Sequence, residues 1–473
     1  MSIIKLIILC IILYGVESTV YDITTSSSNW QSILSNLKPG DLVTMHQGTY
    51  TTAGSGYFQL TLNGLLTQPI IIQGAPDEAR PVIQNPNTSP DAQNILNIQG
   101  SNFMLKHLAF TKGSRGIRVG PAGKMTKKIL IIDCTVYHFI FVATFNAIFD
   151  DLYVYDTATT AFAANDAGNE YYNITLRNTE IKISNTFGGG CVYFGCVNDL
   201  CRMRDSLLEH NYCHDTNGPV GGFRPGFQVK PGSYNVMIRN NACYRVSGPC
   251  ILVYDDYNRG RNFIVGNYAI QSGTGDFGIQ CTSGVTIANN VIFSANLAGI
   301  GVTQNSVYPA IGYIRNVTIS HNTVYMSAAD ACLRLNGATH SNILIANNVF
   351  YCGNQPAITA VTNLASYQIY NNAINGPVSA SGIQPDGTFN IEYNAFFDPN
   401  KMNLYPAVKS PLINAGINLD SQPVAHDFNG KTRSNAKPTV GAYEYSTVVN
   451  PGCQLNSSFK CGSSTAITPD YFI

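Results

Sequence analysis

The residues best suited to catalysis gather in the middle of the chain. Lys230 ends the short stretch 226–230, and Tyr254 follows about two dozen residues later, directly before Asp255 and Asp256. A lysine can act as a general base once its charge is disfavoured, and carboxylate oxygens are the ligands that calcium prefers. We therefore predict that Lys230 and Tyr254 are catalytic residues and that Asp255 and Asp256 are the residues that would bind calcium.

Other side chains near this pair in the sequence extend the predicted site. Functional groups concentrate in loops that are held by a rigid scaffold, and the connection leading into residues 226–230 is among the longest. Arg224 and Arg245 are further catalytic candidates. The predicted substrate-binding residues are Tyr193, His214, Gln228, Arg259 and Gln280.

A repeated pattern indicates which elements position these residues. Five segments alternate apolar and polar residues and then stop at an asparagine: 235–241, 262–267, 284–290, 316–322 and 342–348. The final asparagines Asn241, Asn267, Asn290, Asn322 and Asn348 lie 26, 23, 32 and 26 residues apart. Self-similarity at a period of a few tens of residues is typical of a stacked repeat.

Each repeat also contains a second strand, usually entered through a glycine, as in 226–230, 278–282 and 299–303. Side chains alternate between the two faces of a strand, so Phe227 and Val229 share one face while Gln228 and Lys230 share the other. Stacking such strands in parallel would make residues of successive repeats neighbours. The variable repeat length argues against a left-handed hexapeptide helix. We predict an all-β, right-handed parallel β-helix in which Lys230 and Tyr254 are adjacent.

The final asparagine of each repeat should stabilise the corner where its strand ends. Asparagine tolerates a left-handed backbone, and its amide can bond to its neighbours above and below. At the N-terminal end, Asn29 could cap a short amphipathic helix containing Trp30 and Leu34, which would cover the edge of the first coil. At the far end we expect residues 410–416, 427–430 and 440–445 to close the stack.

The opening residues 37–41 and 48–50, the asparagine-ended repeats and the ending 441–444 resemble the pectate-lyase-like right-handed parallel β-helix superfamily. This superfamily includes polysaccharide lyases, glycoside hydrolases, esterases, epimerases and non-catalytic adhesins, so its fold does not select one activity. Its lyases remove the proton next to a uronate carboxylate. The resemblance implies that Lys230 is the base, that Arg224, Arg245 or Arg259 holds the carboxylate, and that calcium assists. Tyr193 and Tyr254 would stack against sugars.

Three alternatives remain open at this stage. Asp166, Asp199, Asp255 and Asp256 follow equivalent strands and could serve a glycoside hydrolase with paired carboxylates. The protein could instead bind glycans without turnover, or be a structural component of a matrix or cell surface. For Lys230 itself, the alternative is a solvated lysine that precedes the turn at Pro231.

The N-terminal residues predict export. Residues 1–18 combine Lys5 with a short apolar run and small residues, which is typical of a cleaved signal peptide. Residues 19–445 would form the β-helix and 446–473 a tail, and no later segment is long enough to span a membrane. Lys plus Arg equals Asp plus Glu at 28 each, which gives no argument for binding nucleic acid. We expect a secreted monomer whose partner is an extracellular polysaccharide.

Cysteines and asparagines predict covalent modification. Removing Cys10 leaves 12 of 13 cysteines, an even number that suits an oxidising compartment. Cys213 and Cys243 follow successive repeat asparagines by two residues, so we predict that they stack and pair, and that Cys453 and Cys461 close a loop. Cys281 should be a buried thiol. The predicted glycosylation sites are Asn87, Asn173, Asn316 and Asn456.

Overall fold

The structure is a computed structural model. It describes residues 18–53, 58–87, 94–113, 115–120, 125–138, 140–157, 160–183, 189–216, 224–272, 276–304, 313–326, 330–337, 339–361, 367–379, 385–419 and 425–452. The predicted signal peptide, the Cys453–Cys461 loop and Asn456 lie outside these residues. Within them, no helix has the length and apolar character needed to cross a membrane.

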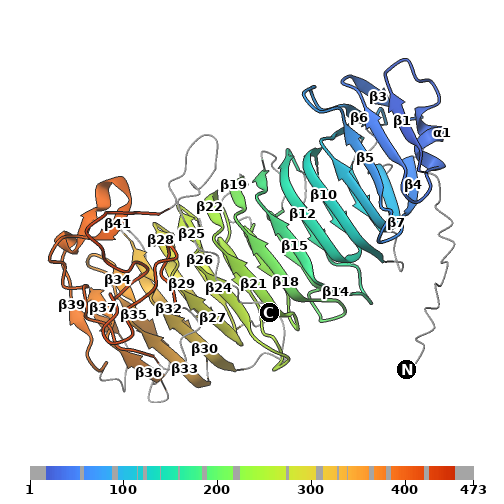
Figure 1. Cartoon of the computed structure of the whole chain (residues 1–473). Helices are drawn as coiled ribbons and strands as arrows, with labels where there is room; N and C mark the ends of the chain where they lie inside the picture. The colour runs from blue at the N-terminus through green and yellow to red at the C-terminus, as the bar shows by residue number, and fades with distance from the viewer. Residues whose placement is uncertain are drawn as a thin grey trace, which may run out of the picture.

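The chain winds into a right-handed parallel β-helix, as the repeats predict (Figure 1). Each coil contributes one strand to each of three parallel sheets, which we call A, B and C, and connections between parallel strands are nearly always right-handed. The long strands β7 (Asn94–Lys106), β10 (Thr126–Tyr137) and β12 (Thr144–Tyr155) bend from one sheet into the next.

Besides parts of these three strands, sheet A comprises β1 (Val20–Ile23), β2 (Leu42–Met45), β5 (Ile70–Gly74), β15 (Ile174–Arg177), β18 (Arg202–Glu209), β21 (Tyr234–Arg239), β24 (Asn262–Val265), β27 (Val285–Ala288), β30 (Ile314–Ser320), β33 (His340–Ala346) and β36 (Tyr367–Tyr370). Sheet B comprises parts of β10 and β12 with β3 (Thr49–Thr51), β6 (Val82–Asn85), β8 (Ala109–Lys112), β16 (Glu180–Lys182), β19 (Tyr212–Thr216), β22 (Ala242–Val246), β25 (Tyr268–Ile270), β28 (Val291–Phe293), β31 (Thr323–Tyr325), β34 (Val349–Tyr351), β37 (Ala373–Asn375) and β39 (Phe389–Asn390). Sheet C comprises part of β7 with β4 (Phe58–Asn63), β9 (Arg115–Val119), β11 (Ile140–Val142), β13 (Phe162–Ala164), β17 (Val192–Phe194), β20 (Phe227–Val229), β23 (Ile251–Val253), β26 (Phe277–Cys281), β29 (Ala298–Thr303), β32 (Ala331–Asn336), β35 (Ile358–Ala360) and β38 (Val378–Ser379). The short strand β14 (Glu170–Tyr172) pairs with the start of β18.

Inward-facing side chains fill the coil in columns that the strand register sets. In sheet A six successive members of one column are isoleucine, because each repeat places this residue at the same register position: Ile238, Ile264, Ile287, Ile319, Ile345 and Ile369. All six are at most 3% exposed. Burying one such side chain contributes about 1.5–3 kcal/mol. The core is thus built from repeated contacts between neighbouring coils.

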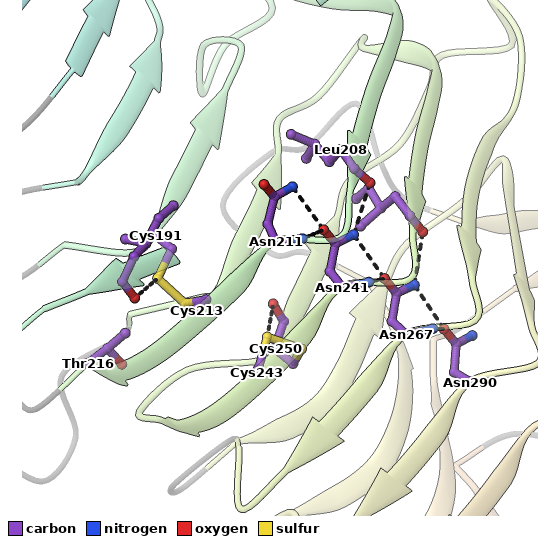
Figure 2. The surroundings of a disulfide bond; sticks show 12 residues. Cys191, Leu208, Asn211, Cys213, Thr216, Asn241, Cys243, Cys250, Asn267 and Asn290 are labelled. Atoms are coloured by element: carbon purple, nitrogen blue, oxygen red, sulfur yellow. Dashed lines mark hydrogen bonds between the residues drawn. A yellow bond between two sulfur atoms is a disulfide. The ribbon is translucent and has the colours of Figure 1, made fainter. Parts of the chain in front are cut away.

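Two successive residues form each corner between sheets A and B. The second is the ladder asparagine, and seven of these stack with at most 1% exposure: Asn211, Asn241, Asn267, Asn290, Asn322, Asn348 and Asn372. Asn241 donates from its backbone N and from Nδ2 to Oδ1 of Asn267, both at 3.0 Å, and from Nδ2 to the Leu208 carbonyl at 2.9 Å (Figure 2). The predicted bonding between neighbouring amides is confirmed.

The left-handed backbone, however, belongs to the residue before each ladder asparagine. These residues have φ between 46° and 66°: His210, Asn240, Gly266, Asn289, His321, Asn347 and Asn371. We expected a single asparagine to adopt the left-handed backbone and also to bond to the amides of neighbouring coils. That expectation was wrong, because the asparagine whose amide faces inward is not the residue with the left-handed backbone. His321 fills the left-handed position and its Nε2 contacts Nδ2 of Asn347 at 3.1 Å. His321 therefore has a structural role at this corner.

Additional segments cover the coil. The helix α1 (Trp30–Ser35) buries Trp30 and Leu34 at the N-terminal end, as expected. After β39 the chain forms the 3-10 turns η1 (Tyr393–Ala395) and η2 (Pro399–Lys401) and the antiparallel pair β40 (Phe396–Asp398) and β41 (Asn403–Pro406).

The segment from β40 onward does not close the far end as predicted. It runs back along the A–B corner, where Asn371, Asn347 and Asn289 bond to Ala415, Ile417 and Arg433, respectively. Phe396, Phe428 and Tyr443 then pack on the outer face of sheet B. The outer aromatic residues of that sheet give this segment a larger apolar surface than the last coil does.

The disulfide prediction needs correction. Cys213 and Cys243 stack in register, but Cys213 bonds to Cys191 and Cys243 bonds to Cys250 (Figure 2). In-register side chains of parallel strands point the same way, so their sulfurs do not face each other. Cysteines directly before β17 and β23 instead meet them across the coil, with Cα separations of 6.0 and 5.6 Å.

The remaining cysteines of the described residues form two further disulfides and two free thiols. Cys332 bonds to Cys352, which again joins sheet C to the end of a sheet B strand, and Cys196 bonds to Cys201 within one loop. Cys134 and Cys281 are buried free thiols. Burial raises the pKa of both, to about 12 for Cys134. The prediction for Cys281 is confirmed.

Candidate functional site

Lys230 and Tyr254 are neighbours, as the repeat predicts. The strands β17, β20 and β23 stack in register, with Tyr193, Gln228 and Leu252 in one outward column. Lys230 follows β20, and its Nζ lies 4.6 Å from the ring centroid of Tyr193 and 4.8 Å from that of Tyr254. The ammonium group is thus held between two aromatic rings from the coils before and after it.

The environment of Lys230 disfavours its charge. The residue is only 5% exposed, so the alternative of a solvated lysine is wrong. Within the described residues no carboxylate pairs with Nζ, and the two rings are its partners. Burial lowers the pKa of Lys230 to about 8. A substantial share of this amine is therefore unprotonated near pH 8, as a general base requires.

Two glycines allow the loops beside Lys230 to approach closely. Gly195 has φ +90°, and a Cβ there would lie 3.1 Å from the Cβ of Lys230. Gly232 has φ +77°, and a Cβ there would lie 1.9 Å from Oδ1 of Asp199. Any side chain at either position would displace the Lys230 turn or the loop around Asp199, which the Cys196–Cys201 disulfide closes.

Arg259 lies at the same corner of the coil. Its Nη1 and Nη2 donate to the two oxygens of Asp199, each at 2.7 Å, and Nη1 also donates to the Gly232 carbonyl at 3.2 Å. A guanidinium carries five N–H donors in a planar fork. Asp199 occupies the end of the fork, and the Nε side has no partner among the described residues. Arg259 could therefore bind a second carboxylate through Nε and Nη2.

The two predicted calcium ligands are already engaged. Asp255 is fully buried, and both its oxygens accept hydrogen bonds from Arg315 at 2.7 Å. Asp256 lies 3.5 Å from Arg315, and the pKa of Asp256 is raised mainly by its burial. The described residues contain no group of three His, Cys, Asp or Glu side chains arranged to hold a metal. A guanidinium at this position does not fit a calcium ion bound by the same oxygens.

Arg315 also indicates the role of the other aspartates. Arg315 lies two coils beyond Asp255, with which it pairs. Two further pairs also join residues that are two coils apart: Arg259 with Asp199, and Arg118 with Asp166 at 2.6 Å. Each pair joins residues 48 or 60 positions apart in sequence. These carboxylates therefore stabilise the corner, and a hydrolase with paired carboxylates has little support from them.

Some predicted site residues lie elsewhere. His214 and Arg245 are on sheet B, in β19 and β22, and not in the connection leading to Lys230. His214 contacts Glu180 at 3.1 Å and Asp215 at 2.9 Å, and Arg245 also pairs with Asp215. They form a separate charged cluster.

Arg224 is buried before β20, at the opposite end of that strand from Lys230. The structure thus brings Tyr193, Lys230, Tyr254 and Arg259 to one corner of the coil and places Arg224, Arg245 and His214 elsewhere, and the roles of the first four stay predictions. Gln228 and Gln280 lie in the outward column of sheet C, as predicted.

Sequence reasoning missed Arg315 and the pairing of Asp199 with Arg259. Both follow from an interaction that skips one coil. Counting two repeats from Asp255 leads to Arg315, so the repeat spacing carries a signal that could have identified it.

The predicted glycosylation sites Asn173 and Asn316 lie at the start of sheet A strands, where Asn173 donates to Asn146 and Asn316 accepts from Asn342, each at 2.9 Å. Glycosylation of Asn87, Asn173 and Asn316 stays a prediction.

No protein-family model and no curated protein matches the chain. Among solved structures it is similar to the PL6 family alginate lyase AlyGC, with a TM-score of 0.48 and 14% identity, over 93% of this chain and 60% of that one. It is also similar to the pectate lyase Pel9A, with a TM-score of 0.42 and 14% identity, over 91% and 98% of the two chains. A mannuronic acid specific polysaccharide family 6 lyase from human gut microbiota gives 0.47 and 15%, over 80% and 92%. The chain thus spans 60% of the length of AlyGC, and the likenesses concern the β-helix fold that the strand register defines.

Proposed function

We propose that this protein cleaves an acidic extracellular polysaccharide by β-elimination, with Lys230 as the base. The observation that carries the proposal is the burial of Lys230 between Tyr193 and Tyr254, which lowers its pKa to about 8 without a carboxylate partner. A structural lysine gains from an ion pair, whereas a general base has to lose its proton near neutral pH.

In this mechanism the neutral Nζ of Lys230 takes the proton at C5 of a uronate, next to the carboxylate. The electron pair left at C5 forms the C4–C5 double bond as the bond from C4 to the glycosidic oxygen breaks. That oxygen leaves with a proton, which the hydroxyl of Tyr254, on the other side of Nζ from Tyr193, would donate. The unused side of Arg259 would pair with the carboxylate and stabilise the negative charge that develops on it.

The experiment is to incubate the purified protein with uronate polymers and follow the ultraviolet absorbance of the new conjugated double bond. We expect turnover by the wild type that rises as the pH increases through about 8, because Lys230 must be neutral. Lys230→Met should abolish it, while Lys106→Met, at an exposed position, should not. Turnover by Lys230→Met equal to that of the wild type would remove Lys230 as the base.

One observation favours a second function. Tyr193, Gln228 and Gln280 lie in one outward column of sheet C, and aromatic and amide side chains in a row suit a face that binds a glycan without reacting with it. In that case a glycan array would give specific binding, no double bond would form with any polymer, and Lys230→Met would leave binding intact. The elimination assay and the array together separate the two functions.

A further inference from the structure

The outward residues of sheet C form two parallel rows that start at the Lys230 coil. One row is Gln228, Leu252, Gln280, Gly301 and Arg334, and the other is Lys230, Tyr254, Thr282, Thr303 and Asn336. Neighbouring strands lie about 4.8 Å apart, so the four steps from Gln228 to Arg334 span about 19 Å. Gln280, Arg334 and Asn336 are partly exposed, whereas the other seven residues of the rows are buried, so a chain that lies along this face from Lys230 would contact the rows chiefly at those three residues.

Two amides in the first row have hydrogen-bonding capacity that no described residue uses, and in Gln280 the unused oxygen is buried. Gln228 is 5% exposed, and its side chain has no hydrogen bond among the described residues. Gln280 donates from Nε2 to Thr303 at 2.8 Å, but its Oε1 is buried without a partner. Buried polar groups are nearly always satisfied, so a buried oxygen without a hydrogen bond calls for a partner. These amides are therefore suited to hydrogen-bond a ligand that lies on the face.

The charges along the same face are few. Between Lys230 and Arg334 both rows are neutral, with amide, hydroxyl and aromatic groups. On the other side of Lys230, Phe141 and Ala163 precede Tyr193, and the next cation, Arg118, is paired with Asp166. Lys230 and Arg259 are the basic groups beside the start of the rows; Arg259 is likewise paired, with Asp199, and its Nε side is left for the carboxylate of a ligand.

A polymer that carries a carboxylate on every sugar would have to place several of them against this neutral row. A carboxylate that loses water without gaining a cation is strongly disfavoured, so such a row selects against it. Hydroxyl and acetamido groups, in contrast, can both donate to and accept from the amides of Gln228 and Gln280.

We propose that the substrate is a heteropolysaccharide in which each uronate is flanked by neutral sugars, and that Gln228 and Gln280 bind those neutral units. This inference rests on the proposed elimination at the Lys230 centre. The uronate carboxylate would pair with Arg259, and the neutral units would lie along sheet C. The next cation in the rows is Arg334, which lies four strand spacings away, or about 19 Å.

The test compares homopolyuronates with the same chains after about half of their carboxyl groups have been reduced to hydroxymethyl groups. Polygalacturonate and polymannuronate serve as two such pairs, and hyaluronan, in which uronate alternates with a neutral N-acetylated sugar, serves as a third kind of substrate. We expect the wild type to form double bonds at least ~10-fold faster, in kcat/KM, on a half-reduced chain or hyaluronan than on the native homopolymers, because only the former match the neutral row.

A charge-adding variant tests the residues. Gln280→Lys and Gln228→Lys should each lower the ratio of kcat/KM on half-reduced chains to kcat/KM on native homopolymers by about 10-fold, because the new lysine can pair with a second carboxylate. Gln368→Lys, at an exposed position of sheet A, is the matched control and should leave the preference unchanged. Faster turnover of native homopolymers by the wild type would overturn the inference while the elimination itself stands.

If no polymer yields a double bond, the proposed elimination is refuted, and equilibrium binding then decides the inference. Tighter binding of half-reduced chains than of native chains would support the neutral row as a binding surface. Equal or tighter binding of the native homopolymers would overturn it. The two failures are therefore distinguishable.

Discussion

Replacing Lys230 by methionine should make the fold more stable at neutral pH. Methionine keeps a long unbranched side chain between Tyr193 and Tyr254 but carries no charge. Burial lowers the pKa of Lys230 from 10.5 to about 8, and one pKa unit corresponds to about 1.4 kcal/mol. The buried ammonium therefore costs about 3 kcal/mol below pH 8. The two rings return about 0.5–1 kcal/mol each, so the net gain on substitution is about 1–2 kcal/mol.

The dependence on pH gives this prediction its sign. Between pH 8 and 10.5 the unfolded chain binds the lysine proton more readily than the folded chain does, so wild-type stability rises with pH in that window. The advantage of Lys230→Met is fully present below pH 8 and disappears as pH rises toward 10.5. A structural lysine would behave in the opposite way, because removing it would lower stability at every pH.

The assay is urea unfolding followed by circular dichroism at pH 7 and pH 9.5, with Lys106→Met as the exposed control. We expect Lys230→Met to unfold at higher urea than the wild type at pH 7, with a smaller difference at pH 9.5. Destabilisation by about 1 kcal/mol or more at pH 7 would refute the reasoning, because the ring contacts would then outweigh the cost of burial. Greater stability together with lost turnover is the pattern of a residue kept for function.

Three further predictions concern the scaffold. Asn267→Ala leaves the Asn241 amide and the Ile238 carbonyl without partners and should cost about 2–6 kcal/mol in urea unfolding, whereas Asn63→Ala, at an exposed position, should cost under about 1 kcal/mol. Arg315→Met isolates the fully buried Asp255 and should cost about 3–5 kcal/mol, and an additional Asp255→Asn change should recover part of it; no recovery would contradict the ion-pair argument. Hydrogen bonds that His46 donates to Glu78 and Asp22 raise the pKa of His46, so its contribution to thermal stability should be present below pH 6.5, be lost as pH rises through the raised pKa, and be absent at every pH in His46→Ala.

Most of the fold could be predicted from the sequence, because the repeat acts through identical local contacts. The isoleucine at one register position and the asparagine that follows each sheet A strand specify stacking without knowledge of the loops. The adjacency of Lys230 and Tyr254 follows from that register alone. By contrast, the pairing of Cys213 with Cys191 depends on the direction in which side chains cross the coil, which the period does not reveal.

The parts of the site that escaped prediction share a physical cause. Arg315 reaches Asp255 by skipping a coil, and the length of an arginine side chain, not the repeat, decides that contact. His214 and Arg245 were placed near Lys230 because sequence proximity to a long connection was taken as spatial proximity. They belong instead to sheet B, where the strand that follows a ladder asparagine must lie.

The corner with the ladder asparagine has a consequence for how such a protein can change over time. From β18 to β37 the chain always spends two residues there, whereas the corner beside Lys230 uses seven residues after β17, four after β20, eight after β23 and three after β26. The connections from sheet B to sheet C vary as well, with ten residues after β19, four after β22 and six after β25, so insertions and deletions are absorbed at the other two corners while the hydrogen-bonded amides hold the pitch of these coils. Lineages, or engineers, could exchange the loops that surround the reactive amine one at a time, and each graft would inherit an unchanged backbone pitch on which to present its new side chains.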